Sequence, residues 1–181
     1  MNLNNKFLLA LPLILFVVGS CENDIEKVRI ISSKSEMPVE STFNATLLYS
    51  DSAQLQVKLI APQLDRFSGE KPYLELPSGV ELEFYDSDME ISSRLTANYA
   101  ISYEETGLME AKGNVVLINE LGEQLNTEHL IWDEKTGKIY SEEFVKITTA
   151  DEIILGEGFE SNQSFTKFKI KKIKGTINIE N

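Results

Sequence analysis

Residues 95–119, LTANYAISYEETGLMEAKGNVVLIN, decide the fold, because they align without a gap with residues 125–149, LNTEHLIWDEKTGKIYSEEFVKITT, at a spacing of 30 residues. One further step of the same length places Leu155 under Leu125, and an earlier, less regular copy begins at residues 59–61. A unit with one apolar face buries that face only against a neighbour, so such units stack and share a core. The aligned pairs are Thr106 and Thr136, Gly107 and Gly137, Met109 and Ile139, Ala111 and Ser141, Val115 and Val145, and Leu117 and Ile147.

Apolar and polar residues alternate in the same way outside the two copies, as in residues 43–49 (FNATLLY), 55–61 (LQVKLIA) and 80–84 (VELEF). Alternation with period two is typical of half-buried strands, and turn-forming clusters separate the segments. The sequence therefore predicts an all-β domain over residues 41–181, built from antiparallel strand pairs of about 30 residues each. The alternative is that hairpins of similar length look alike without being a repeat.

The first twenty residues are not part of this domain. They carry one charge, Lys6, then an uninterrupted apolar run over residues 7–18 that contains Pro12 and is shorter than the roughly 20 residues of a membrane-spanning helix. We predict a cleaved signal peptide over residues 1–20. Residues 18–21, VGSC, resemble the bacterial lipobox, which implies that Cys21 becomes a lipidated N-terminus. The polar residues 21–40 are predicted to form a tether, and no cofactor other than this covalent lipid is expected.

The charge of the chain excludes one class of partner. Asp and Glu number 29 against 17 Lys and Arg, which gives a formal net charge of −12. Nucleic-acid phosphates would be repelled by such a protein, so DNA or RNA binding is not expected. The chain also lacks a phosphate-binding Gly-Lys-Ser/Thr loop of the Walker type, so it must rely on a partner for any energy from ATP.

Residues 95–133 contain the patterns LTAxY, GxMEAKGNV and LNTExLxWD. These patterns resemble the OstA-like repeat of the lipopolysaccharide-export families LptA and LptC, and the arrangement of one anchor, one tether and one domain is most similar to the LptC family. The resemblance implies an incompletely closed OstA-like β-jelly roll. One departure is the lipobox, because well-known LptC proteins keep an uncleaved transmembrane helix.

The resemblance also implies a function and a location. A protein of this kind accepts lipopolysaccharide from an inner-membrane ABC transporter with LptF/LptG-like periplasmic domains. It passes the lipid through an apolar groove to an LptA-like periplasmic bridge. We therefore expect a membrane-anchored periplasmic lipoprotein, and Glu22 after the lipidated cysteine favours the inner over the outer membrane.

Two sets of residues carry this expectation. The inward positions of the alternating segments would line the acyl-chain groove, although an ordinary sandwich core would use the same residues. The first and last strands, around 43–61 and 165–179, would meet partner strands at open sheet edges. The predicted groove residues are Leu47, Tyr49, Leu55, Leu59, Leu82, Phe84, Leu95, Ala97, Tyr99, Val115, Leu117, Ile139, Val145, Ile147 and Phe159. The predicted edge residues are Phe43, Ala45, Val57, Ala61, Phe168, Ile170 and Ile177.

No catalytic or metal-binding residues are predicted. His129, the only histidine, has no serine or cysteine nucleophile arranged around it, and residues 86–90, DSDME, lack the glycine and spacing of a calcium loop. The chain is therefore not expected to be an enzyme. Two alternatives stay open: an envelope lipoprotein whose β module is structural or binds protein without lipid, and a hydrolase of envelope glycans with a carboxylate pair in a polar cleft. A continuous inward apolar track would distinguish the lipid carrier from both.

Overall fold

A computed structural model describes residues 37–179, and in this part of the chain it contains strands and no helix. The predicted signal peptide, Cys21 and most of the predicted tether lie outside the described residues. The strands are β1 (Glu40–Asp51), β2 (Gln54–Phe67), β3 (Tyr73–Leu76), β4 (Val80–Tyr85), β5 (Ile91–Ala97), β6 (Tyr99–Tyr103), β7 (Leu108–Asn119), β8 (Gln124–Asp133), β9 (Lys138–Thr148), β10 (Glu152–Asn162) and β11 (Phe168–Asn178).

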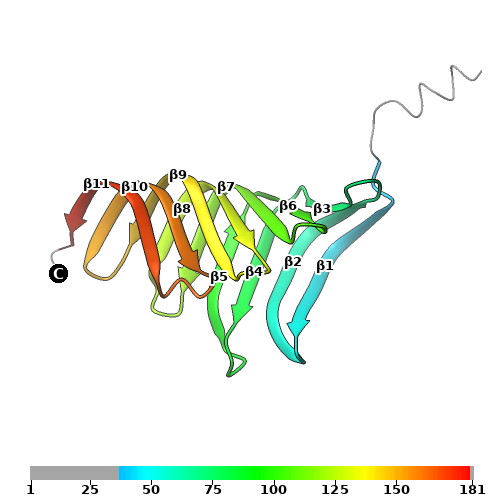
Figure 1. Cartoon of the computed structure of the whole chain (residues 1–181), viewed down its shortest axis with the longest axis horizontal. Helices are drawn as coiled ribbons and strands as arrows, with labels where there is room; N and C mark the ends of the chain where they lie inside the picture. Colours follow the sequence, from blue (N-terminus) through cyan, green and yellow to red (C-terminus); the bar gives the residue numbers. More distant parts are fainter. Residues whose placement is uncertain (1–36, 180–181) are drawn as a thin grey trace, which may run out of the picture. The chain divides into compact units, whose positions relative to one another are not determined.

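All the strands belong to one antiparallel sheet. The pairing runs from β1 through β2, β4, β5, β7, β8, β9 and β10 to β11, while β3 and β6 pair with each other and with β2 and β7. Figure 1 shows β1 and β11 at opposite ends of this series. They do not pair with each other, so the predicted all-β, incompletely closed jelly roll is confirmed.

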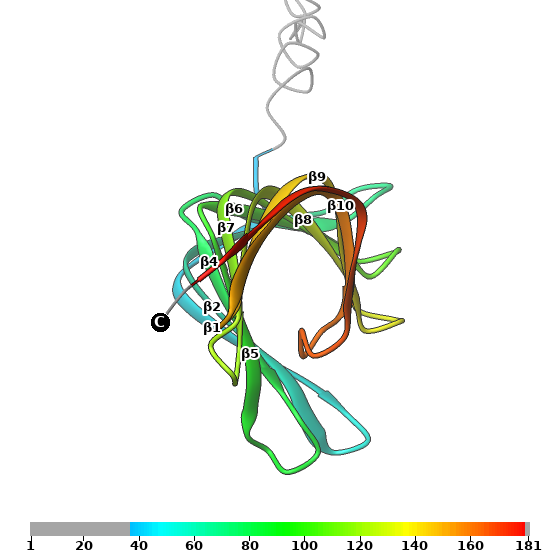
Figure 2. The ribbon, with the colours of Figure 1, turned by 90° about the vertical axis from the view of Figure 1, so that its left-hand side faces the viewer.

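The sheet forms two layers because its long strands change partners halfway. Val57–Ile60 of β2 pair with β4, whereas the C-terminal end of β2 pairs with β3. In the same way, one half of β7 pairs with β5 and the other half with β6. We call the side that contains β4 and β5 the first layer and the side that contains β3 and β6 the second layer. Figure 2, viewed from the β11 end, shows the strands wrapping around a common interior.

Irregular pairing marks the corner between the layers. The register shifts between Lys112 and Val115 in β7, and again near the middle of β10. Gly113 and Asn114 have φ values of 74° and 49°, and Gly158 in β10 has 73°. Glycine and asparagine tolerate this left-handed conformation best, and such bulges bend a strand sharply. The Gly113-Asn114 pair is therefore the point where β7 passes from one layer to the other.

The 30-residue correspondence fails at one position, in the bulged strand β10. Leu125 faces the interior and is paired with Ile147, which in turn pairs with Ile154. Leu155, which the 30-residue spacing places under Leu125, pairs instead with Lys146 on the opposite face. The repeat holds for β7 and β9, whose inward residues correspond as aligned, but in β10 the inward position is shifted by one residue.

Gly156 offers a stability test of the β10–β11 pair. A Cβ atom on Gly156 would meet Ile170 Cγ2 and would stand 2.8 Å from the backbone oxygen of Lys172. We expect Gly156→Ala to lower the free energy of unfolding by about 1–3 kcal/mol, because the two strands must move apart. The matched control is Gly175→Ala on β11, where an added Cβ meets nothing within 4 Å and stability should stay within about 0.5 kcal/mol. Chemical denaturation measures both; equal losses would contradict the close packing at Gly156.

Candidate apolar groove

A continuous row of aliphatic side chains crosses the first layer from β1 to β10. Residues directly opposite each other on paired strands lie on the same face, so the register defines the row. Its members from β4 to β9 are at most 1% exposed. In pairing order the row contains Leu47, Leu59, Leu82, Leu95, Leu117, Leu125, Ile147 and Ile154.

A second row crosses the other layer from β3 to β11, and the two inner faces meet. Phe84 of the first layer contacts Trp132 of the second edge to face, with ring centroids 5.3 Å apart. The buried residues of both layers form one contiguous apolar cluster. In pairing order the second row contains Leu74, Ser102, Met109, Trp132, Ile139, Ser161 and Phe168.

The interior opens at the β1 end into a cavity of about 270 Å³, here called the N-terminal cavity. Both rows contribute to its wall, so it lies between the layers. Tyr49 at its rim is 43% exposed, and a hydrogen bond with Glu134 raises the pKa of the Tyr49 phenol. The lining residues are Leu47, Leu48, Tyr49, Val57, Leu59, Leu74, Leu82, Ser102, Met109, Trp132 and Glu134.

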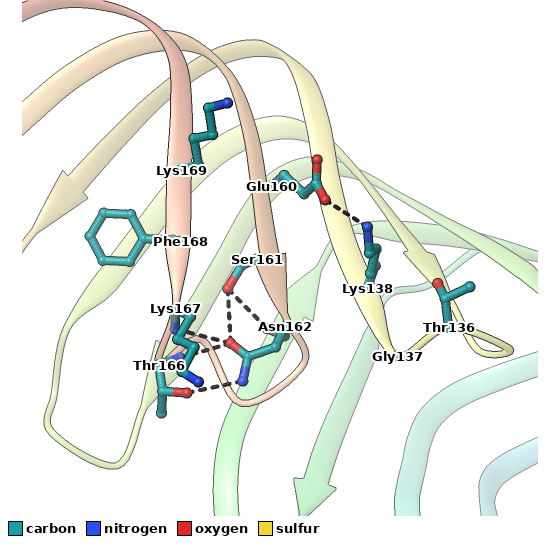
Figure 3. Close-up of a pocket in the computed structure, with 10 residues that line it drawn as sticks. All are labelled: Thr136, Gly137, Lys138, Glu160, Ser161, Asn162, Thr166, Lys167, Phe168 and Lys169. Carbon is teal, nitrogen blue, oxygen red and sulfur yellow. Dashed lines mark hydrogen bonds and ion pairs between the residues drawn. The ribbon is translucent and has the colours of Figure 1, made fainter.

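A larger and more polar cavity of about 870 Å³, the C-terminal cavity, lies where β9, β10 and β11 meet. Figure 3 shows Lys138 facing Glu160 and Asn162 bonded to Thr166 and Lys167. The Lys138 Nζ and Glu160 Oε1 atoms are 2.8 Å apart. Its lining residues are Thr136, Gly137, Lys138, Glu160, Ser161, Asn162, Thr166, Lys167, Phe168 and Lys169. The second row ends here at Phe168.

The loop between β10 and β11 inserts Phe165 into the core, whereas the sequence predicted the last edge strand to begin around residue 165. Phe165 is fully buried, has a φ of 50° and packs against Phe159 and Phe168 with centroids 5.8 and 5.3 Å apart. Asn119 Nδ2 on β7 donates to the Phe165 backbone oxygen at 2.9 Å. Ser93 Oγ on β5 donates to the backbone oxygen of the nearby Gln163. The loop therefore ties β10 to strands that are not its neighbours in the sheet.

Most of the predicted groove residues are core residues between the layers, and the others lie at the N-terminal cavity, near the β1–β2 turn or on the outer face. Leu47 and Tyr49 line the N-terminal cavity at 40% and 43% exposure, and Leu55 is half-buried near the β1–β2 turn. Those buried to less than 10% exposure are Leu59, Leu82, Phe84, Leu95, Ala97, Val115, Leu117, Ile139, Val145, Ile147 and Phe159.

Tyr99 is the exception, and its predicted place in the groove is wrong. The strand breaks at Asn98, whose N–H donates to the Gly113 oxygen at 3.0 Å, and the alternation resumes one residue out of phase. The buried residue is Ala100, whereas Tyr99 pairs with Lys112 on the outer face. There its hydroxyl donates to Glu75 at 2.9 Å, and partial burial together with this bond raises the pKa of Tyr99 to about 12.

The predicted edge residues do not all lie on free edges. Phe43 on β1 is exposed, as is Ile177 on β11, while Phe168 and Ile170 are half-buried against the core. Ala45 is buried on β1. Val57 and Ala61 lie on β2, which pairs with β1 on one side and with β4 on the other, so the free edge at this end belongs to β1 alone.

A charged cluster on the outer face joins β2, β4 and β5. The side chain of Glu83, 9% exposed, accepts hydrogen bonds from Arg94 at 2.8 Å and from Lys58 and Tyr85 at 3.1 Å each. The bond from Arg94 is the main cause that lowers the pKa of Glu83 below its usual 4.5. Ionised Glu83 therefore stabilises the pairing of these three strands.

We expect Glu83→Gln to lower the free energy of unfolding by about 1–2 kcal/mol at pH 7. Because folding lowers this pKa, the stabilisation is present above pH 4.5 and is lost as the pH falls through the lower folded value. The difference between wild type and variant should therefore shrink below pH 4.5. Glu81→Gln, which removes one exposed partner of Arg94, is the control with an effect within about 0.5 kcal/mol. A pH-independent difference in denaturation experiments would contradict this role for the Glu83 charge.

The histidine and the carboxylates that the sequence singled out have surface contacts. His129 Nε2 lies 3.3 Å from Glu110, and the hydrogen bond from Lys112 is the main cause that lowers the pKa of Glu110. Asp86 accepts the N–H groups of Asp88 and Glu90 in a turn. Within residues 37–179 no three metal-binding side chains gather. The same residues include no helix long and apolar enough to cross a membrane.

Comparison with known proteins gives one family. The model of the family LptC, described as lipopolysaccharide-assembly, LptC-related, matches residues 7–178. No curated protein matches the chain. The match covers every strand of the sheet up to the last residue of β11. The chain therefore belongs to the LptC family of lipopolysaccharide-assembly proteins.

Proposed function

We propose that this protein accepts lipopolysaccharide from an inner-membrane ABC transporter and passes it through its interior to an LptA-like bridge. Membership of the LptC family makes it an envelope-associated component of lipopolysaccharide transport rather than a member of an enzyme family. The direct handling of lipid and the identity of its partners are the parts that we add. We also propose that a lipid on Cys21 anchors the protein in the inner membrane.

The continuous apolar track between the layers is the observation that carries the proposal. An acyl chain of about twelve methylenes would cost roughly 10 kcal/mol to expose to water, at about 0.8 kcal/mol each. A carrier therefore needs an apolar lining without gaps. The first row provides one from Leu47 on β1 to Ile154 on β10, and the N-terminal cavity lies at its β1 end.

The two free strands suit partners that add a strand. Among residues 37–179, β1 pairs only with β2 and β11 only with β10, so each presents one backbone edge that no described strand covers. We propose that β1 meets the LptF/LptG-like domains of the transporter and β11 the bridge. Phe43 and Leu48, 68% and 63% exposed on β1, would be covered by such a partner.

Photocrosslinking in living cells tests lipid handling. A photoreactive phenylalanine derivative replaces Tyr49 at the rim of the N-terminal cavity or Phe168 at the end of the second row. Phe144, 52% exposed on β9, is the matched aromatic control, because it pairs with Glu157 on the face opposite to Val145. We expect lipopolysaccharide adducts at Tyr49 and Phe168 and none at Phe144. Protein adducts alone at the first two positions would favour the structural module.

A further inference from the structure

The last strand, β11, is a basic strand on an acidic protein. It contains Lys169, Lys171, Lys172 and Lys174 and no acidic residue, whereas the whole chain has a formal net charge of −12. All four lysines are exposed. Among residues 37–179, β11 pairs only with β10, so these lysines border a row of backbone N–H and C=O groups that no described strand covers.

The carboxylates of the neighbouring strands balance this charge only in part. Glu157 Oε2 on β10 lies 3.4 Å from Lys172 Nζ and 3.2 Å from Lys174 Nζ, so one carboxylate is shared by two ammonium groups. Lys171 forms an ion pair with Glu142 on β9. The strand therefore keeps an excess of positive charge after its pairs within the sheet are formed.

Lys169 adds to this excess. It lies opposite Glu160 of β10 in the register. In Figure 3, however, Glu160 is paired with Lys138 and not with Lys169. A carboxylate on the uncovered side of β11 would therefore meet an ammonium group that its own sheet does not pair.

Aliphatic side chains alternate with the lysines on the same strand. Ile170 lies opposite the buried Phe159, and Ile173 lies opposite Gly156, which pairs with the buried Val145. Both isoleucines are therefore on the inward side, yet Ile173 is 63% exposed. Lysines on a free edge oppose association with other strands, whereas covering an exposed isoleucine favours it. The two together favour a strand that supplies negative charge on one face and apolar side chains on the other.

A second copy of this chain does not supply such a strand at its own free edge. The outer face of β1 carries Thr46 and Leu48, which lie opposite Ile60 and Lys58 of β2. Neither side chain has a charge that would pair with the lysines of β11. The complementary strand must therefore come from a different protein.

We propose that β11 binds an extended strand of a partner protein in which Asp or Glu alternates with aliphatic residues. The carboxylates lie opposite Lys169 and Lys172 on the outer face, and the aliphatic side chains cover Ile170 and Ile173 on the inner face. The inference rests on the proposed function, in which β11 meets the bridge, and adds the chemistry by which this edge selects its partner. Opposite charges across a strand pair stabilise it and like charges destabilise it, so the lysines admit acidic strands and reject basic ones.

Three fluorescent peptides of about nine residues test the proposal by anisotropy, with the full chain in phosphatidylcholine nanodiscs. Glu alternates with Val in the first, Gln replaces Glu in the second, and the third is the Glu peptide with a N-methylated backbone. Two cross-strand charge pairs predict that the Glu peptide binds about 2- to 30-fold more tightly than the Gln peptide. The N-methylated peptide keeps the charge but lacks the amide donors of a strand, so it should not bind. Added salt should reduce the preference.

The variant Lys169→Gln/Lys172→Gln should bind the Glu and Gln peptides equally. The matched control, Lys71→Gln/Lys146→Gln, removes the same charge from exposed positions outside β11 and should keep the preference. Equal binding of the two peptides by the wild type would overturn the proposal without any variant. A preference that persists in Lys169→Gln/Lys172→Gln would overturn it too, as would binding of the N-methylated peptide, because charge attraction alone would then explain the result.

The photocrosslinking experiment separates this inference from the proposed function. Lipopolysaccharide adducts at the two expected positions, without a preference for the Glu peptide, would remove only the charge selection at β11. A preference for the Glu peptide without lipid adducts would support the partner edge and count against lipid handling.

Discussion

Leu117→Asp is expected to abolish cooperative folding. Leu117 is fully buried at the centre of the first row, between Leu95 and Leu125. An unpaired carboxylate there loses hydration and gains no partner, and the leucine contacts are lost as well, so the expected cost exceeds about 5 kcal/mol. That equals much of the total stability of a typical domain, about 5–15 kcal/mol. Circular dichroism and urea titration measure the loss.

The control for Leu117→Asp is Leu121→Asp, since Leu121 lies in the turn after β7 and is 75% exposed. It introduces the same charge four residues away and should leave the unfolding midpoint almost unchanged. A folded Leu117→Asp variant with a normal midpoint would mean that water reaches the middle of the interior. The assignment of the row as a sealed apolar track would then be wrong.

Phe165→Ala is expected to lower the free energy of unfolding by about 3–5 kcal/mol, because it leaves a cavity beside Phe159 and Phe168. Phe165→Gly should cost slightly less than the alanine variant, since glycine adopts the φ of 50° without strain whereas alanine does not. The matched control is Lys167→Ala, which removes an exposed side chain of the same loop.

Hydrogen exchange should show where the effect of Phe165→Ala lies. The amides of β10 and β11 should lose protection first, because the loop no longer holds them against β5 and β7. A uniform loss of amide protection over all strands would contradict the view that Phe165 holds β10 and β11 against β5 and β7. If Phe165→Ala were as stable as Lys167→Ala, the Phe165 ring would contribute nothing to stability.

Much of this structure could be predicted from alternation alone. The positions of Leu82, Leu95 and Leu117 follow from period two, since each lies within a regular strand and the pairing places them side by side. The prediction failed where a strand changes phase. The break at Asn98 turns Tyr99 outward, and the bulges in β10 make Ile154 the inward residue in place of Leu155.

Other features depend on contacts between distant segments. Phe165 lies in the polar stretch before β11, and its place in the core depends on packing against Phe159 and Phe168 and on the tertiary bonds to the loop backbone. A lone aromatic residue in such a stretch was the one available signal. The burial of the Trp132 indole nitrogen without a hydrogen-bond partner among residues 37–179 was equally invisible, because a sequence shows that a donor exists but not which acceptors surround it.

The pairing order also has a consequence for how the chain folds. Strands β7 to β11 each pair with their neighbours in sequence, so their contacts are local and form quickly, one strand at a time. β2 to β7, by contrast, form a closed circuit of pairings that is complete only when β7 is available. The pairings among β2 to β6 are therefore not closed into a circuit until β7 has joined the sheet. The last strand is added independently, and β11 can fray while the rest stays folded.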